Sequence, residues 1–208
     1  MSDRGGRESR SRGGHRAERR ERRPTASRRA GVARLFVAIY PPPDRVRALL
    51  DSLGRVELPD HRATPDEQVH MTVLFVGEVD ASRLDGVKES VERAAAGVKP
   101  FDLRPLHLAP LPERGPARLV AAITDAPSPL LELHQRLVQR LAVGKRKAAT
   151  FLPHVTLCRL RTPADVDVAT PLVDVEPFRV DTLHLMQSHL GPDGATHRGL
   201  ARVPLDDR

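Results

Sequence analysis

The chain has little of several residue types that whole classes of protein depend on. It contains one cysteine, no tryptophan, five phenylalanines and one tyrosine among 208 residues. A single cysteine excludes an internal disulfide framework, and it also excludes zinc ribbons and cluster sites, which need several cysteines. No run of about 18 apolar residues is present, so no segment is predicted to span a membrane. We therefore expect a soluble, cytoplasmic protein.

The positive charge is concentrated at one end of the chain. Residues 1–34 carry 12 arginines and 4 acidic residues, a net charge of +8, whereas the other 174 residues carry a net charge of −1. The first 33 residues have almost no large apolar side chains, so they cannot bury enough surface to offset their chain entropy. We expect a disordered arginine-rich tail at 1–33 and one folded domain at 34–208. The tail is either a solvated extension or an arm that binds phosphate groups.

The domain alternates strand patterns with helix patterns. Two strand–helix–strand passages, each followed by further strands, predict an α+β protein with an internal duplication. Asp44, Asp80 and Ser128 are the expected helix N-caps, and glycines close the first two helices. Strands are predicted at 35–40, 69–76, 101–108, 119–124, 151–160, 178–187 and 200–205, and helices at 44–54, 80–97, 128–141 and, as a short one, 163–169.

Two short strings show the duplication most clearly. The first is Val69-His70-Met71-Thr72-Val73, and the second is Pro153-His154-Val155-Thr156-Leu157. Both have the pattern His-apolar-Thr-apolar inside a predicted strand. The composition of the chain gives about 0.07 such strings by chance, so two occurrences point to a shared role.

The pleat of a strand explains why this pattern carries chemistry. Residues two apart point to the same face, so each histidine projects together with its threonine. If the two halves pack about an approximate two-fold axis, the two pairs face each other across a cleft. A neutral imidazole can accept a proton, a protonated one can donate it, and hydroxyls can hold phosphate oxygens. The pattern therefore predicts a metal-free site for in-line displacement at phosphorus.

These motifs place the chain beside a known family. It resembles the two-histidine (2H) phosphoesterases, and within them the LigT-like (ThpR) RNA 2′,3′-cyclic phosphodiesterases. The resemblance covers about residues 34–205, and it rests on residues 34–38, 70–77, 151–159 and 185–190. It implies an α+β, bilobal fold with pseudo-two-fold symmetry. Each lobe is expected to have an antiparallel sheet with helices, and the active site is expected in a central groove.

The resemblance also implies an activity and a role for each motif residue. The activity is hydrolysis of an RNA-terminal 2′,3′-cyclic phosphate to a 2′-phosphate. His70 would donate a proton to the 3′ oxygen, and His154 would accept a proton from the attacking water. Thr72 and Thr156 would bind the phosphate. No metal or cofactor takes part in this chemistry.

Two further residues match positions that the family uses around the substrate. They are Phe75 and Arg159, and strict alternation places both on the face opposite their histidines. A twist, a bulge or a strand end must therefore bring them into the site. The chain departs from the resemblance at His197, where relatives tend to carry a tyrosine. If that ring positions a base, the base preference differs here.

The remaining candidates predict no second site. Cys158 lies on the same predicted face as His154, but about 13 Å along the strand, so a buried core thiol is the better interpretation. The chain has no GxxxxGK loop, no GxGxxG loop and no HExxH motif, and nothing predicts a metal or a nucleotide cofactor. Most of the aromatic residues of the domain lie at apolar strand positions that suit the core, so they give little support to RNA binding by stacking: Phe36, Tyr40, Phe75, Phe101, Phe151 and Phe178. We interpret the other histidines as surface or structural: His61, His107, His134, His184 and His189.

Three functions stay open at the level of sequence. The first is metal-independent hydrolysis of cyclic phosphate on RNA ends or nucleotides by a monomer. The second is 2′–5′ RNA ligation on the same fold. The third is a non-catalytic RNA- or nucleotide-binding protein that keeps the groove. The intact His-x-Thr pairs favour an enzyme, because binding alone needs no matched acid and base.

Overall fold

The computed structural model describes residues 31–142, 150–191 and 194–206. The predicted tail therefore lies outside the described residues except at its last three positions. The main elements are β1 (Val32–Ile39), α1 (Pro43–Gly54), β2 (His61–Ala63), β3 (Met71–Asp80), α2 (Leu84–Ala95), β4 (Phe101–Leu103), β5 (Pro105–Leu111), β6 (Ala117–Thr124), α3 (Ser128–Leu141), β7 (His154–Ala164), β8 (Phe178–Val180), β9 (Thr182–Gly191) and β10 (Gly194–Pro204). Two short 3-10 turns, η1 (Asp66–Gln68) and η2 (Ala81–Arg83), lie just before β3 and α2 respectively.

One antiparallel sheet runs through the molecule. Its strand order is β10–β9–β1–β3–β7–β6–β5, with β2 paired to β7, and β4 and β8 form a separate small sheet. Within the described residues, β3 and β7 pair at a single position, where Met71 lies opposite Val155. The sheet therefore has two halves that meet at this pair, which we call the seam. This is the bilobal α+β architecture predicted from the sequence.

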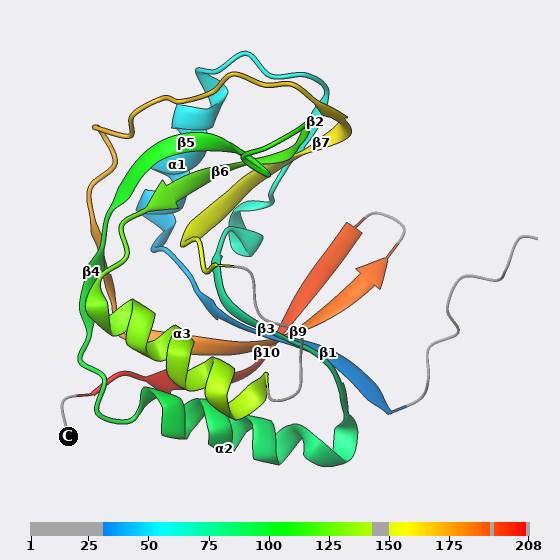
Figure 1. Ribbon diagram of the computed structural model, residues 1–208, viewed down its shortest axis with the longest axis vertical. Coiled ribbons are helices and arrows are strands. Elements are labelled where there is room, and N and C mark those ends of the chain that lie inside the picture. Colours follow the sequence, from blue (N-terminus) through cyan, green and yellow to red (C-terminus); the bar gives the residue numbers. More distant parts are fainter. Residues whose placement is uncertain (1–30, 143–149, 192–193, 207–208) are drawn as a thin grey trace, which may run out of the picture.

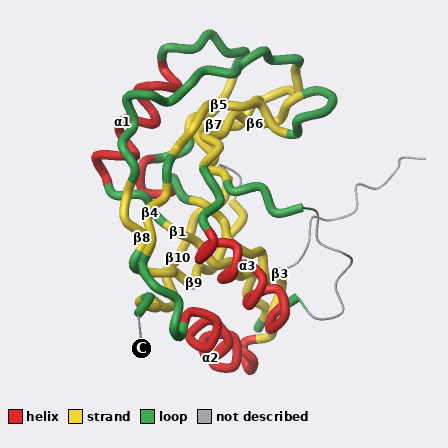
Figure 2. The backbone as a smooth tube through the Cα atoms, turned by 60° about the vertical axis from the view of Figure 1, so that its left-hand side comes forward, coloured by secondary structure: helices red, strands yellow, loops and turns green. Residues whose placement is uncertain are grey.

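The two halves are built on the same strand–helix–strand unit. The first unit is β1–α1–β3 and the second is β6–α3–β7, and in each unit the two strands pair directly. The helices are exchanged between the halves, because α1 packs against β7 and α3 packs against β3. Figures 1 and 2 show α1 at one end of the molecule and α2 beside α3 at the other. Because each helix packs against a strand of the other half, this exchange determines how the two halves pack together.

Both exchanged helices have a proline as their N-cap residue rather than the predicted polar caps. The N-cap residues are Pro42 and Pro127, and their carbonyl groups accept hydrogen bonds from the first helical turn. Asp44 and Ser128 lie inside the helices, and Asp80 precedes η2 rather than α2. The prediction of these caps was therefore wrong. Proline suits this position because its ring holds the extended conformation and it has no N–H group to leave unpaired.

Two predicted strands are each divided between the two sheets. The predicted strand 101–108 breaks at Arg104, whose backbone N–H donates to Asp125 Oδ1 at 2.8 Å. The predicted strand 178–187 breaks at Asp181, whose backbone carbonyl accepts a hydrogen bond from outside the strand. Sequence patterns show the apolar run but not the point at which its backbone changes partner.

Other element boundaries also differ from the sequence prediction. The predicted short helix at 163–169 is wrong, because β7 continues to Ala164 and no helix follows it before residue 171. β1 begins at Val32, three residues earlier than predicted, and β10 begins at Gly194, six residues earlier. The three-residue strand β2 was missed because so short a run has no period to detect.

The main hydrophobic core lies between the sheet and the three helices. Two smaller clusters of buried residues cover the other face, one on each side of the seam. The first consists of Phe36, Ala38 and Met186, with Tyr40 packed against it. The second consists of Leu111, Ala121 and Ile123, with Ala109, Leu119 and Leu152 packed against it.

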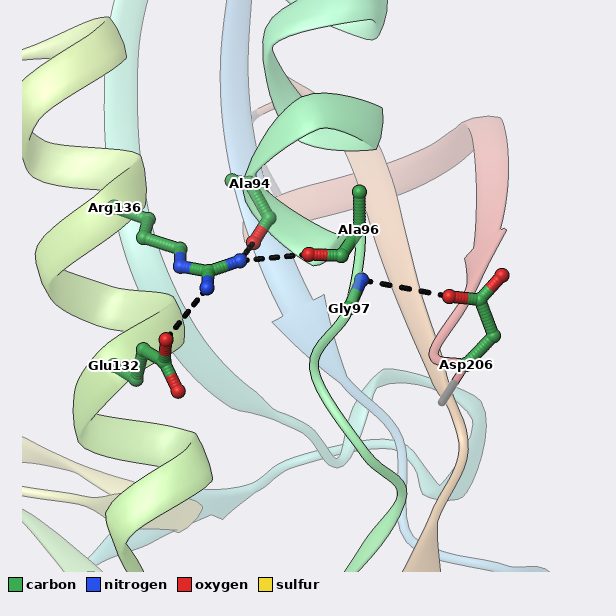
Figure 3. A network of polar contacts seen from close by, with 6 residues as sticks. All are labelled: Ala94, Ala96, Gly97, Glu132, Arg136 and Asp206. Carbon is green, nitrogen blue, oxygen red and sulfur yellow. Dashed lines mark hydrogen bonds and ion pairs between the residues drawn. The ribbon is translucent and has the colours of Figure 1, made fainter. Parts of the chain in front are cut away.

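Arg136 on α3 supports the end of α2, as Figure 3 shows. Its guanidinium donates to the carbonyl of Ala96 at 2.7 Å, to that of Ala94 at 3.3 Å and to Glu132 at 2.6 Å. The last carbonyl groups of a helix have no partner within the helix, so this side chain satisfies acceptors that are otherwise open. Gly97, just after α2, donates its N–H to Asp206 at 3.4 Å and ties the same corner to the end of the chain.

We expect Arg136→Met to lower the free energy of unfolding by about 1–3 kcal/mol, because the carbonyl groups at the end of α2 lose a charged donor. Urea denaturation measures this change, with Arg140→Met, an exposed position on the same helix, as the control. Equal stability of the two variants would show that the contacts in Figure 3 do not hold the two helices together.

Candidate active site at the seam

The seam determines which face carries the motif side chains. Met71 and Val155 are fully buried, so their side chains enter the main core. Neighbours along a strand point to the other face of the sheet. An antiparallel pair also has a local two-fold axis, so each strand presents its flanking residues to the other in the same way. The predicted symmetry therefore has its axis at this pair.

Four motif side chains lie together on the face opposite the core. Continuing the register by one residue on each side sets His70 across from Thr156, and Thr72 across from His154. The two histidines then occupy diagonal positions, for which Cα atoms are about 7–8 Å apart. All four residues are half-buried. The structure thus brings together two imidazoles and two hydroxyls from residues 84 positions apart in the sequence.

Both histidine rings are held by the same local hydrogen bond. His70 Nδ1 lies 2.6 Å from the carbonyl oxygen of Gln68, and His154 Nδ1 lies 2.8 Å from that of Leu152. A carbonyl accepts only, so Nδ1 carries the proton in each ring and Nε2 is the nitrogen that takes or gives one. His70 Nε2 lies 3.2 Å from Thr72 Oγ1. The local hydrogen bonds therefore fix the orientation of both rings in the absence of a ligand.

Each motif is followed by a β-bulge at the same position. The pairing of β3 with β1 skips Val73, and the pairing of β7 with β6 skips Leu157. A bulge inserts one unpaired residue, so the alternation of faces reverses beyond it. Phe75 and Arg159 thereby come to the same face as the motif histidines, in contrast to strict alternation. Phe75 is 66% exposed there.

The same bulge corrects the placement of Cys158. Strict alternation puts this residue on the face of His154, but beyond the bulge it points into the main core and is fully buried. Burial raises the pKa of its thiol, which keeps it protonated. The interpretation as a buried core thiol is confirmed.

His134 on α3 supports both motif strands. Its Nδ1 lies 2.9 Å from the carbonyl oxygen of Val73, the bulge residue of β3. Its ring stacks on Phe151, with centroids 4.0 Å apart and planes within 6°. Phe151 lies three residues before His154. His134 therefore has a structural role, because it links α3 both to the bulge in β3 and to the segment just before β7.

The surroundings of His70 lower its affinity for a proton. Burial, the largest cause, lowers its pKa from 6.5 to about 4, although the hydrogen bond to Gln68 acts in the opposite direction. Charges on His197, His154 and Arg159 lower the pKa further. His70 is therefore neutral at pH 7 in the free protein. Of these groups Arg159 carries a permanent positive charge, which would favour a bound anion.

An aromatic wall surrounds the His70 ring on the side of β1, β9 and β10. Ring centroids of Phe36, Tyr40 and His197 lie 5.1, 5.5 and 5.1 Å from that of His70. Phe36 also lies 6.3 Å from Phe75. The sequence predicted core positions for most of the aromatic residues, whereas the structure places Phe36 and Tyr40 on the site face. Nearly all of β1 is buried, so alternation of exposure could not distinguish its two faces.

A hollow of about 740 Å³ opens beyond this wall. Its lining includes Tyr40, Gln68, His184, His197 and Arg202. His184, interpreted from the sequence as surface or structural, is half-buried and lies edge to face with Tyr40 at 5.0 Å. The sequence contains one signal for this surface, which is the alternation of His184 and Met186 with buried leucines along β9. This alternation could not show which strands lie next to β9.

The other predicted histidines stay outside the site. His61 donates a hydrogen bond from Nδ1 to the carbonyl oxygen of Pro59 at 2.8 Å. His107 lies on β5, and His189 is exposed. Among the described residues, no group of three or more His, Cys, Asp or Glu side chains is placed to hold a metal ion. No helix within the described ranges is long and apolar enough to cross a membrane.

Comparison with known proteins gives consistent matches. The family model of the 2′-5′ RNA ligase superfamily matches residues 41–192. A Thermus thermophilus protein named RNA 2′,3′-cyclic phosphodiesterase is 28% identical over 185 residues, which cover 83% of this chain and 90% of that protein. The crystal structure of TT0787 from the same organism has a TM-score of 0.74 at 26% identity, and covers 83% of this chain and 97% of that one.

A second solved structure supports the fold. The crystal structure of E. coli LigT in its apo form has a TM-score of 0.70 at 21% identity, and covers 85% of this chain and 99% of that one. The family model spans well over half of the chain and includes both motifs. The chain therefore belongs to the 2′-5′ RNA ligase superfamily of two-histidine phosphoesterases, and its fold is LigT-like.

Proposed function

We propose that this protein hydrolyses RNA-terminal 2′,3′-cyclic phosphate to a 2′-phosphomonoester without a metal ion. The observation that carries this proposal is the arrangement of His70, Thr72, His154 and Thr156 about the seam, which offers an acid, a base and two phosphate-binding hydroxyls. The name of the Thermus relative supports the same substrate.

The reaction follows from where the groups lie. His154 Nε2 takes a proton from water, and the water oxygen attacks phosphorus as the bond to the 3′ oxygen breaks. His70 Nε2 gives a proton to that 3′ oxygen, so one water is added and the 2′ ester remains. The hydroxyl groups of Thr72 and Thr156 donate to the non-bridging oxygens. A positioned imidazole carries out each proton transfer, so each transfer should increase the rate about 10²–10⁴-fold.

Phe75 and Arg159 are proposed to contact the substrate at the rim of the site. The bulges turn both toward the motif face, and the charge of Arg159 reaches His70. A guanidinium there would attract the phosphate, and an exposed ring would cover it. Their place on the motif face supports substrate contact but assigns no proton transfer to either.

The basic limb of the kcat/KM profile is expected near pH 4. His70 must be protonated to act as the donor, and its pKa of about 4 in the free protein lies below the ordinary 6.5. As the pH rises through this low pKa, His70 loses the proton that it donates, so kcat/KM should fall. Bound phosphate adds negative charge beside the ring, so the corresponding limb of kcat should lie at higher pH.

Steady-state rates between about pH 3.5 and 9 measure both limbs, with circular dichroism at each pH to confirm that the protein is folded. A basic limb of kcat/KM at the ordinary histidine pKa of about 6.5 or above would contradict the role of a buried His70 as donor.

The product distinguishes hydrolysis from the two alternatives. Incubation of an oligonucleotide that ends in a 2′,3′-cyclic phosphate should give a 2′-phosphate, identified by phosphorus NMR. In ligation, the 5′-hydroxyl of a second RNA takes the place of water, so adding such an RNA should give a 2′–5′ linkage. Binding without any product would leave only the non-catalytic alternative.

A further inference from the structure

We propose that His134 on α3 is a positioning residue, which holds the bulge of β3 at Val73 and thereby keeps Phe75 on the face of the active site. This inference rests on the proposed function and deepens it, because it gives a residue outside the seam a part in the reaction. A bulge reverses the alternation of a strand only while its extra residue stays in place. Whatever holds Val73 therefore also determines where Phe75 points.

The bulge leaves the backbone of Val73 without a place in the sheet. Within the described residues, the register of β3 with β1 skips Val73, and β7 pairs with β3 only at Met71. Val73 is 1% exposed, so its carbonyl oxygen needs a partner from the protein. His134 Nδ1 donates to that oxygen at 2.9 Å. Without this donor a buried acceptor would lose its hydrogen bond, which disfavours the bulged arrangement.

The ring of His134 is held in the orientation that this hydrogen bond requires. It stacks on Phe151, with centroids 4.0 Å apart and planes within 6°. A ring held by its face presents its edge, which carries Nδ1, to the neighbouring strand. His134 and Val73 are 61 positions apart in the sequence, so the bond joins the helix of the second strand–helix–strand unit to a strand of the first.

The corresponding bulge in β7 is held in a different way. Its extra residue is Leu157, whose carbonyl oxygen accepts a hydrogen bond from the backbone N–H of Thr64 at 2.8 Å. That donor belongs to the main chain, so it is present with any side chain at position 64 except proline. The bulge in β3 depends on a side chain instead. A conservative substitution can therefore remove the support of one bulge and leave the other intact.

Phe75 lies two residues beyond Val73 and depends on the bulge for its position. Its ring is 66% exposed, and its centroid lies 6.3 Å from that of Phe36 on the site face. An exposed side chain makes few contacts of its own, so the backbone beneath it decides where it lies. Loss of the bond from His134 should let the bulge shift and move Phe75 away from the rim of the site. His134 thus acts on the substrate through Phe75.

A fluorescence experiment tests the position of residue 75 without any substrate. The chain contains no tryptophan, so Phe75→Trp introduces a single reporter. His134→Phe keeps the stack on Phe151 and the size of the ring but removes the donor. It should raise acrylamide quenching of this reporter, by up to about 1.5-fold if the exposure of position 75 rises from 66% to full. His134→Asn keeps an N–H donor near the place of Nδ1 and should restore the original quenching.

A second reporter separates a local effect from a general loosening of the fold. Leu190→Trp on β9 is the matched reporter, because Leu190 is 67% exposed, and its quenching should not respond to His134→Phe. Circular dichroism confirms that each variant is folded. Unchanged quenching at position 75 would overturn the inference. Equal changes at both positions would also overturn it, because His134 would then support the whole fold and not the bulge.

Kinetics test whether the position of Phe75 matters for the reaction. His134→Phe should lower kcat/KM for a cyclic-phosphate-ended oligonucleotide about tenfold, chiefly through KM, and should cause no further loss when added to Phe75→Ala. Gln135→Phe, an exposed position on the same helix, should keep the unmodified rate. Additive losses would overturn the inference. Absence of turnover in the unmodified protein would refute the hydrolysis instead, and the fluorescence result would still decide the role of His134.

Discussion

Replacing His154 with alanine is expected to lower kcat for a cyclic-phosphate-ended oligonucleotide about a thousandfold, and His70→Ala should have an effect of similar size. Each variant removes one of the two proton transfers at the seam. Half-buried polar positions next to a buried strand pair tolerate alanine, so both variants should fold. His61→Ala is the matched control, because its Nδ1 makes the same local bond to a carbonyl two residues earlier.

The two roles can be separated by changing the leaving group. A 4-nitrophenyl phosphodiester releases a stabilised anion that needs no proton, so the His70 variant should recover most of its activity on that substrate. The His154 variant should stay impaired, because water must still be deprotonated. Equal recovery of both variants would contradict the assignment of donor and acceptor, although not the presence of the site.

Replacing both motif threonines is the second large effect that we expect. Thr72→Val and Thr156→Val keep the shape of the side chain but remove a hydroxyl that would donate to phosphate oxygen. Hydrogen bonds to charged groups are worth about 1.5–3 kcal/mol, so each variant should lose about 10–100-fold in kcat/KM. Affinity for inorganic phosphate should fall with it, as measured by isothermal titration. Thr162→Val, an exposed position on β7, should bind phosphate as the unmodified protein does.

A double variant indicates how the two hydroxyls act. If both contact one phosphate, the losses should not add in full, because the first substitution already loosens the ligand. Additive losses would indicate two independent contacts, and unchanged phosphate affinity in both variants would remove the threonines from the site.

The motif residues could be predicted from the sequence because their geometry is local. His70 and Thr72 share a face through the period of a strand, and the second string repeats the first. The apolar runs likewise predicted most strands and the three main helices. These inferences need only neighbours along the chain, for which sequence patterns are informative.

The features that the sequence did not predict depend on contacts between distant segments of the chain. The bulges at Val73 and Leu157 bring Phe75 and Arg159 onto the site face, and only the pairing with β1 and β6 shows them. The exchange of α1 and α3 between the halves has no local pattern either. The division of residues 101–108 between two sheets falls at Arg104, whose backbone N–H and carbonyl both bond to the distant Asp125.

The position of the aromatic wall could not be predicted from the sequence for a different reason. Phe36 is buried, as the sequence predicted, but it is buried against His70 and not in the main core. An apolar strand covered on both faces gives no alternation from which to separate them. The residues around a site can therefore be identified as buried from the sequence while their side of the sheet stays undetermined.

The most direct test of the central claim is turnover by the chelator-treated protein. The protein is dialysed against EDTA, freed of divalent ions, and incubated with an oligonucleotide that ends in a 2′,3′-cyclic phosphate. If two imidazoles carry both proton transfers, the 2′-phosphate should form at an undiminished rate, and added Mg²⁺ or Mn²⁺ should not increase it. No product until a divalent ion is restored would contradict the account.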